Sequence, residues 1–259
     1  MSRALVVGAG PAGLMAADVI ADAGHSVVVC DHMPSPARKF LMAGKSGLNL
    51  TKDEPIGDVL AAFPDLPPPL EAALRDFGPT EVIRWAEALG QEVFAGSTGR
   101  VFPRAMKASP LLRSWLARLE AKGVTLSRRW KWIGWDEAGQ PRFETPEGPR
   151  MIDPAATVLA LGGASWPRLG STGNWPKALS NVATFRPANM GLNVDWSDHM
   201  TRHVGQPVKG ITLRAGGLLS RGEVTISAHG LEGGGIYEVS GAVRDGAPLI
   251  IDLKPDWSV

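Results

Sequence analysis

The sequence has a single cysteine, Cys30, among 259 residues, so no disulfide can form within the chain. Charge of one sign is not in excess: 27 Lys and Arg oppose 26 Asp and Glu, and the formal net charge of +1 predicts neither a nucleic acid nor a membrane surface as partner. The least polar stretch, residues 4–17, contains glycines and a proline and is shorter than the ~20 residues that span a bilayer. No Gly-x-Ser-x-Gly turn occurs, which removes the usual hydrolase signature.

The remaining composition is that of a globular protein, 44% hydrophobic and 20% charged, in a chain long enough for one large domain or two modest ones. The start, Met1-Ser2-Arg3, leads into an apolar run without signal-peptide architecture, so we expect a cytoplasmic protein. The 31 Gly and 21 Pro are high counts. They indicate tight turns and close backbone approaches of the kind that accompany a large bound ligand.

The first thirty residues have the pattern of a strand, a helix and a second strand. Residues 4–7 are a short apolar run, residues 12–23 are rich in Ala, Leu and Met up to Gly24, and residues 26–30 are a β-branched run that ends at Asp31. Two buried apolar strands joined by a helix are typical of a parallel sheet. The predicted fold class is therefore α/β, a doubly wound, Rossmann-like domain.

The pattern changes along the chain. Amphipathic helices are predicted before Gly90 and Gly123 and a further buried strand at residues 157–161, whereas residues 33–53 and the proline-rich stretch near residues 63–69 predict irregular structure. Beyond about Trp175 the helical periodicity fades and short β-like runs dominate. We therefore predict two domains, a Rossmann-like cofactor domain over residues 1–180 and a β-rich inserted domain over residues 181–259.

The turn after the first strand has the pattern Gly8-x-Gly10-x-x-Gly13. These glycines permit a tight turn, close approach to a pyrophosphate and close packing of the next helix, whose N-terminus faces the phosphates. Asp31 follows Gly13 by 18 residues, near the spacing of a carboxylate that binds ribose hydroxyls. Because a carboxylate repels a 2′-phosphate, the site favours FAD or NAD over NADP. A purely structural glycine turn is the alternative.

A basic loop follows this acid. Arg38, Lys39 and Lys45 are placed to fold over a diphosphate, with Asn49 and Thr51 as hydrogen-bond donors. A solvated surface loop is the alternative for each of these residues.

Further along, Arg128, Arg129 and Lys131 alternate with tryptophans between residues 125 and 143. Such a stretch suits either a stacking platform for single-stranded nucleic acid or a half-buried hairpin. The hairpin is favoured because the chain as a whole is neutral.

Motifs through nearly the whole chain resemble a known family. The segment Gly8–Gly13, paired with a late strand ending Ala160-Leu161-Gly162-Gly163, resembles the two-dinucleotide-binding-domain flavoproteins. Further motifs follow in the family's order: Arg38-Lys39 before a glycine loop and Asn49-Leu50-Thr51, then Gly99-Arg100-Val101-Phe102-Pro103 with Lys107-Ala108, Gly170-Ser171-Thr172-Gly173, Val208-Lys209-Gly210-Ile211 and Ala228-His229-Gly230-Leu231-Glu232-Gly233. On these motifs the sequence is similar to the HI0933-like or BaiN-like family of NAD(P)/FAD-dependent flavoproteins.

The resemblance implies an FAD-dependent oxidoreductase that transfers a hydride or electron pair between bound flavin and a small-molecule substrate or NAD(P)H. The late strand is then expected to return beside the first strand. Together with the glycine motif, it gives the expected cofactor-binding residues Gly8, Gly10, Pro11, Ala12, Gly13, Asp31, His32, Arg38, Lys39, Asn49, Ala160, Gly162 and Gly163. The candidates for catalytic residues near the flavin ring are Lys45, Asn49 and His229.

No metal site is expected, because His199 and His203 have i, i+4 spacing but no third ligand nearby. Cys30 lies on an apolar strand and is expected to be an inert buried thiol.

The chain departs from the family in two respects. The loop before Asn49 has the sequence Gly44-Lys45-Ser46-Gly47-Leu48, where the family has consecutive glycines followed by Arg-Cys. The family's final glycine-rich segment, which returns to the flavin, does not follow Val259. We therefore expect a truncated chain with an incomplete second domain and flavin-ring pocket. A non-catalytic dinucleotide-binding module is the alternative function.

Overall fold

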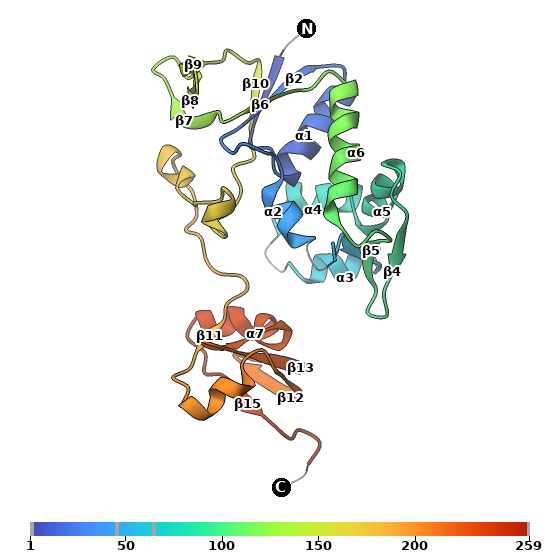
Figure 1. Cartoon of the computed structure of the whole chain (residues 1–259), viewed down its shortest axis with the longest axis vertical. Helices are drawn as coiled ribbons and strands as arrows, with labels where there is room; N and C mark the ends of the chain where they lie inside the picture. Colours follow the sequence, from blue (N-terminus) through green and yellow to red (C-terminus); the bar gives the residue numbers. More distant parts are fainter. Residues whose placement is uncertain (1–2, 45–46, 64–65, 258–259) are drawn as a thin grey trace. The chain divides into compact units, whose positions relative to one another are not determined.

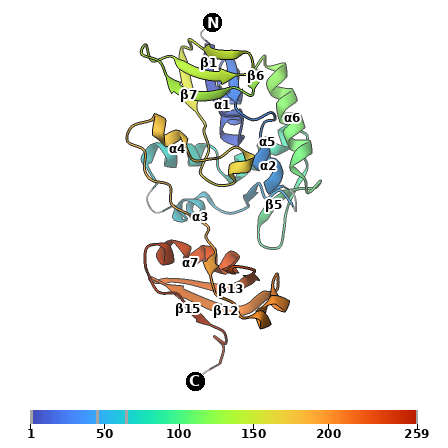
Figure 2. The same cartoon turned by 60° about the vertical axis from the view of Figure 1, so that its left-hand side comes forward.

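The computed structural model describes residues 3–44, 47–63 and 66–257. The chain divides into two compact units, Met1–Val182 and Ala183–Val259 (Figures 1 and 2). Among the described residues, no helix combines the length and the apolar character needed to cross a bilayer.

Four parallel strands form the central sheet of the first unit, in the order β10-β1-β2-β6 (Figure 1). The helix α1 (Pro11–Asp22) connects β1 (Arg3–Val7) to β2 (Ser26–Asp31), as predicted. The late strand β10 (Ala156–Leu159) pairs with β1, and β6 (Thr125–Arg128) pairs with β2. The predicted Rossmann-like α/β class and the return of the late strand beside the first strand are therefore confirmed.

The two faces of this sheet bury different layers, because alternate residues of a strand point to opposite sides. Val6 and Val29 face a helical layer that contains the fully buried Leu14 and Trp115. The helices of this layer are α1, α5 (Pro79–Ala88) and α6 (Ala108–Ala121). The predicted helices before Gly90 and Gly123 are thus confirmed.

The opposite face of the sheet is covered by an antiparallel meander of β7 (Lys131–Trp135), β8 (Pro141–Thr145) and β9 (Gly148–Met151). Phe143 is fully buried there against Leu5 and Val28, and Trp130 and Trp132 pack on the same cluster. The predicted hairpin is confirmed for β7 and β8. The prediction was wrong for residues 125–128, which form β6, because they pair with β2 as an edge strand of the parallel sheet instead.

Two segments that were predicted to be irregular contain regular structure. Residues 33–53 include α2 (Arg38–Ala43) and β3 (Thr51–Lys52), and the latter pairs in a small sheet of order β3-β5-β4. The helix α4 (Pro68–Asp76) begins within the proline cluster. Prolines are tolerated there because the first helical residues have no intrahelical acceptor for their N–H groups. The other elements of this region are α3 (Ile56–Ala61), β4 (Val93–Ala95) and β5 (Arg100–Pro103).

The second unit is an antiparallel sheet with one helix packed on it (Figure 2). The strand order is β11-β14-β13-β12-β15, with β11 (Leu192–Asn193), β12 (Pro207–Ala215), β13 (Leu218–Ser227), β14 (Gly230–Glu232) and β15 (Ile250–Asp252). Ile211 and Leu213 of the sheet contact Ile236 and Val239 of α7 (Gly234–Arg244) in the core. The expected β-rich content is confirmed, but the helix α7 was missed, because its first residues are glycines that predict a turn.

Candidate functional site

The glycine turn lies at the carboxyl end of β1, and its three glycines have different structural roles. Gly8 has φ +108°, and a Cβ on it would lie 2.3 Å from the carbonyl oxygen of Ala160. A Cβ on Gly13 would lie 1.8 Å from the carbonyl oxygen of Gly8. Contacts within the protein therefore require a glycine at both positions.

Gly10 differs from these two glycines. Its φ of −81° suits any residue, and a Cβ on it would meet no protein atom within 4 Å. The fold itself does not require a glycine at this position. The open space beside Gly10 is what close approach of a ligand to the backbone would need.

The N-terminus of α1 opens from the same turn. Gly10 is its N-cap residue and Pro11 begins the helix, with no side-chain cap and no acidic residue in the first turn. The first intrahelical bond joins the N–H of Leu14 to the carbonyl of Gly10, so the N–H groups of Ala12 and Gly13 have no acceptor within the helix. These amides and the helix dipole provide a binding site for an anion such as a diphosphate.

Asp31 ends β2 beside this turn and fixes its shape. Oδ2 accepts a hydrogen bond from the N–H of Ala9 at 2.6 Å, and Oδ1 accepts one from the N–H of Met33 at 2.7 Å. Its side chain is 13% exposed, and Nδ1 of His32 lies 3.8 Å from Oδ1. Each carboxylate oxygen can accept a further hydrogen bond, so the predicted contact with ribose hydroxyls is compatible with this geometry.

Arg38 and Lys39 begin α2, which the backbone ties to the glycine turn. The N–H of Ala37 donates to the carbonyl of Ala9 at 2.8 Å, and Ala37 has φ +53°. Nε of Arg38 is shielded from solvent and has no hydrogen-bond partner among the described residues. A shielded guanidinium nitrogen without an acceptor fits an anionic ligand, because an unsatisfied polar group is costly.

The glycines after β10 complete this edge of the sheet. The N–H of Ala160 donates to the carbonyl of Val7 at 2.8 Å. Gly162 has φ +75°, and Nζ of Lys39 lies 3.8 Å from the position of a Cβ on it. A Cβ on Gly163 would meet nothing within 4 Å. The structure therefore brings Lys39 and the late glycines together near the turn, and their role in binding a cofactor stays a prediction.

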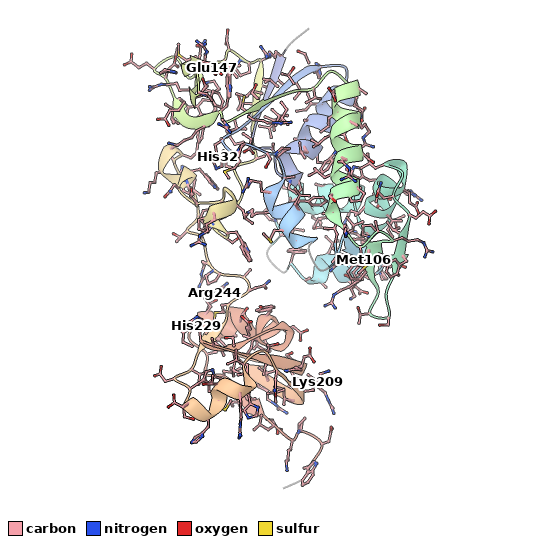
Figure 3. The ribbon with its side chains drawn as sticks, in the orientation of Figure 1. His32, Met106, Glu147, Lys209, His229 and Arg244 are labelled. Atoms are coloured by element: carbon pink, nitrogen blue, oxygen red, sulfur yellow. The ribbon has the colours of Figure 1, made fainter. Side chains whose placement is uncertain are left out.

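The segment Gly170-Ser171-Thr172-Gly173 covers the His32 side of this region. A Cβ on Gly170, which has φ +106°, would lie 2.8 Å from Cγ of Met33 and 3.2 Å from the ring of His32. Figure 3 shows His32 between the sheet and the segment after β10. Sequence reasoning assigned no role to this contact, although the two glycines at residues 170 and 173 signal the tight turns that make it possible.

The three catalytic candidates are placed differently. Lys45 lies outside the described residues. Asn49 is exposed between α2 and β3. His229 is exposed in the second unit, where its neighbour Gly230 is required by a contact within that unit, since a Cβ on it would lie 1.8 Å from the carbonyl oxygen of Leu192 (Figure 3). A catalytic role for each of them stays a prediction.

Cys30 is fully buried in the strand before Asp31, and burial raises the pKa of its thiol to about 12. The predicted burial of this thiol is confirmed, and its low reactivity stays a prediction, because only the thiolate is reactive. His199 and His203 lie on the short helix η3 (Asp198–His203). Within the described ranges, no group of three or more His, Cys, Asp or Glu side chains is placed to hold a metal ion.

Comparison with known proteins gives matches over nearly the whole chain. Residues 2–191 match the HI0933-like protein Rossmann domain, and residues 186–259 match the HI0933-like protein barrel and H2TH domain. A ribosomal RNA dihydrouridine synthase of Escherichia coli (strain K12) is 25% identical over 264 residues, with 98% of this chain and 64% of that protein covered. The chain thus spans slightly less than two thirds of the length of this relative.

Solved structures with a similar fold include a 3-ketosteroid-Δ4-(5α)-dehydrogenase from Rhodococcus jostii RHA1, at 15% identity and a TM-score of 0.45, with 62% of this chain and 46% of that chain covered. Another is BexE, from a study of oxidation during BE-7585A biosynthesis. It has 16% identity and a TM-score of 0.45, and the match covers 97% of this chain and 52% of BexE.

Proposed function

The chain belongs to the HI0933-like family, and on this premise we propose that it is an FAD-binding oxidoreductase. One observation above all supports the proposal: Gly10 is a glycine that the protein's own packing does not require, at the N-terminus of a helix that presents unpaired amides. A purely structural turn explains Gly8 and Gly13 but not Gly10. A bound diphosphate that approaches the backbone closely would explain Gly10 as well.

We assign the cofactor-binding residues from the contacts described above. The N–H groups of Ala12 and Gly13 would hold the diphosphate, and Asp31 would accept hydrogen bonds from a ribose. The shielded nitrogen of Arg38 and the ammonium group of Lys39 would contribute positive charge from the other side. Because the backbone N–H groups of Ala9 and Met33 already hold the Asp31 carboxylate, that part of the site is preorganised and needs little ordering on binding.

Bound FAD would supply a group that accepts and donates electron pairs, while the protein supplies binding, orientation and electrostatics. We propose NADH or NADPH as the electron donor. The cationic groups of Arg38 and Lys39 would stabilise negative charge in the site, and Gly162 and Gly163 would let the backbone lie close to the cofactor.

The first experiment is to add excess FAD to the purified chain, remove the unbound fraction and record the visible absorbance. Retained flavin absorbance that bleaches anaerobically with NADH or NADPH supports the oxidoreductase. Retained flavin that neither donor reduces favours the alternative, a non-catalytic module. A chain that never retains FAD contradicts the proposal.

A second candidate concerns the substrate. The E. coli relative, a ribosomal RNA dihydrouridine synthase, aligns with 98% of this chain. We therefore propose a uracil base in RNA as a candidate substrate beside the small molecules expected from sequence. Saturation of its C5–C6 double bond would add a hydride to one carbon and a proton to the other. The hydride's electron pair would come from NAD(P)H, which becomes NAD(P)+, and the proton would come from water.

The test for this candidate is incubation of a uridine-containing RNA with the FAD-loaded protein and NADPH, followed by digestion and mass spectrometry of the nucleosides. A uridine that gains two hydrogen atoms supports the reaction. Unchanged uridine, with flavin that NADPH does reduce, leaves the oxidoreductase but removes this substrate.

A further inference from the structure

Two segments of the first unit contain basic residues and no acidic one. Residues 32–52 include Arg38 and Lys39 but neither Asp nor Glu, and residues 154–182 include Arg168 and Lys177 but again neither acid. Elsewhere acids are common, since Asp and Glu make up 26 of the 259 residues. The nearly neutral net charge therefore conceals a local excess of positive charge.

The fold places these two segments against each other. Gly170 of the second segment packs on His32 and Met33 of the first, and Lys39 Nζ lies beside Gly162. Figure 1 shows the segment after β10 passing the side of the unit where α2 lies. Together the two segments form one edge beside the glycine turn, where Asp31 is the neighbouring acid.

Two cations of the second segment are exposed. Arg168 and Lys177 are exposed, and neither forms an ion pair with a described residue. By contrast, the exposed Arg75 pairs with Glu71 at 2.7 Å. Exposed cations without ion-pair partners attract a polyanion.

An exposed aromatic ring accompanies these cations. Trp166 is 63% exposed and has φ +59°, a left-handed conformation that non-glycine residues seldom adopt. It directly precedes η1 (Pro167–Leu169), which contains Arg168. Trp175, at the start of η2 (Trp175–Ala178), donates from Nε1 to the carbonyl of Gly162 at 2.9 Å and so anchors the segment.

We propose that Trp166, Arg168 and Lys177 form a binding surface for single-stranded RNA. A base would stack on the indole of Trp166, and phosphates would pair with the two cations, because an aromatic face beside unpaired positive charge is the combination that single strands favour. The other basic and aromatic stretch does not offer such a surface, since Trp130 and Trp132 pack in the core of the meander. The inference rests on the proposed function for its chemistry, but binding is measurable independently of turnover.

This proposal departs from the expectation that no nucleic acid binds. That expectation came from the net charge of the whole chain. A sum over the chain does not report how charges are distributed in space, and the local field at a surface depends on that distribution.

The test uses the full chain and a short, fluorescently labelled, uridine-rich RNA, with binding followed by anisotropy at several salt concentrations. We expect Trp166→Ala to weaken binding by roughly tenfold or more, through the loss of one stacked base. Arg168→Ala with Lys177→Ala should reduce the slope of log affinity against log salt by about 1.4, the value for two phosphate contacts on a single strand. Trp166→Phe should restore most of the affinity.

Matched controls separate this surface from exposed residues in general. Trp257→Ala removes a tryptophan that is 72% exposed in the second unit, where Lys254 Nζ lies 4.0 Å from its ring. Arg75→Ala with Arg84→Ala removes two arginines that pair with glutamates. Neither control should change the affinity or the salt slope.

Flavin absorbance of every variant distinguishes the possible outcomes. If Trp166→Ala loses RNA but keeps FAD, the inference is supported. If that variant loses both, Trp166 belongs to the cofactor pocket and the inference is overturned. Wild-type protein that keeps FAD but does not bind the RNA also overturns it, and leaves the oxidoreductase intact. RNA binding through Trp166 in a chain that never retains FAD contradicts only the proposed function.

Discussion

Replacement of Gly10 by alanine tests the cofactor site more sharply than any other change. The new Cβ would meet no protein atom within 4 Å, and the backbone φ of −81° suits alanine. Alanine is a weaker N-cap than glycine, which lowers the free energy of unfolding by up to about 1 kcal/mol. Alanine also reduces the conformational freedom of the unfolded chain, which raises the free energy of unfolding by about 0.4–1 kcal/mol. The melting temperature should therefore change by only a few degrees.

Binding of FAD should respond much more strongly. The added methyl group occupies the space that the diphosphate needs at the N-terminus of α1, and it removes at least one charge-assisted hydrogen bond of about 1.5–3 kcal/mol. At about 1.4 kcal/mol for each factor of ten, the dissociation constant should rise roughly ten- to 150-fold. Titration of flavin fluorescence measures this constant, and thermal unfolding by circular dichroism measures stability.

Two further glycine variants provide the controls. Gly57→Ala in α3 also adds a Cβ with nothing within 4 Å, but far along the chain from the turn, and should leave FAD binding unchanged. Gly13→Ala would place a Cβ 1.8 Å from the carbonyl oxygen of Gly8 and should destabilise the fold. An unaltered dissociation constant in Gly10→Ala would refute the assignment of this turn. Unfolding of Gly10→Ala comparable to that of Gly13→Ala would refute the reasoning from open space.

Three other predictions concern acidic and thiol groups. Asp31→Ala should weaken FAD binding on the order of tenfold or more, through lost charge-assisted hydrogen bonds, as measured by the same titration; unchanged affinity would place the carboxylate outside the site. Asp18 is buried and accepts hydrogen bonds from Trp115 Nε1 at 3.0 Å, Lys122 Nζ at 2.6 Å and Arg118, so Asp18→Asn should cost about 2–3 kcal/mol in urea unfolding. Burial raises the pKa of Asp18, but its hydrogen bonds to the two cations outweigh burial and hold the pKa below the ordinary value of 3.8. This contribution is therefore present above about pH 4 and lost as the pH falls through the lower folded pKa, and Asp18→Asn should lack that dependence. Cys30, with its pKa raised to about 12, should resist thiol reagents until the chain unfolds, and rapid labelling of the native protein would contradict its burial.

Much of the first unit was predictable because its signals are local. The strand before Gly8, the helix after it and the acid at Asp31 follow from hydrophobic periodicity and spacing within about thirty residues. The structure confirms each of these elements. The helix α7 escaped prediction because its glycine-rich start opposes a helix, and packing of Ile236 and Val239 on the sheet overrides that preference.

The chemistry of the site required contacts that no local pattern contains. Sequence spacing marked Gly8, Gly10 and Gly13 as equivalent members of one motif. Only the structure separates Gly10, which has open space beside it, from the two glycines that touch backbone. Likewise, Arg38 is one of several basic residues in a loop until its position shows a shielded nitrogen without an acceptor.

The sequence by itself therefore determined the βαβ unit, its glycine turn, the acid that follows and the family, because these depend on neighbours along the chain. Tertiary structure alone decided which glycine leaves room for a ligand. It also decided that Asp31 accepts a hydrogen bond from the N–H of Ala9 in the turn. It also decided that two acid-free segments, more than one hundred residues apart, form one edge. The physical reason is that burial, steric contact and electric field depend on distances in space, which a linear pattern does not contain.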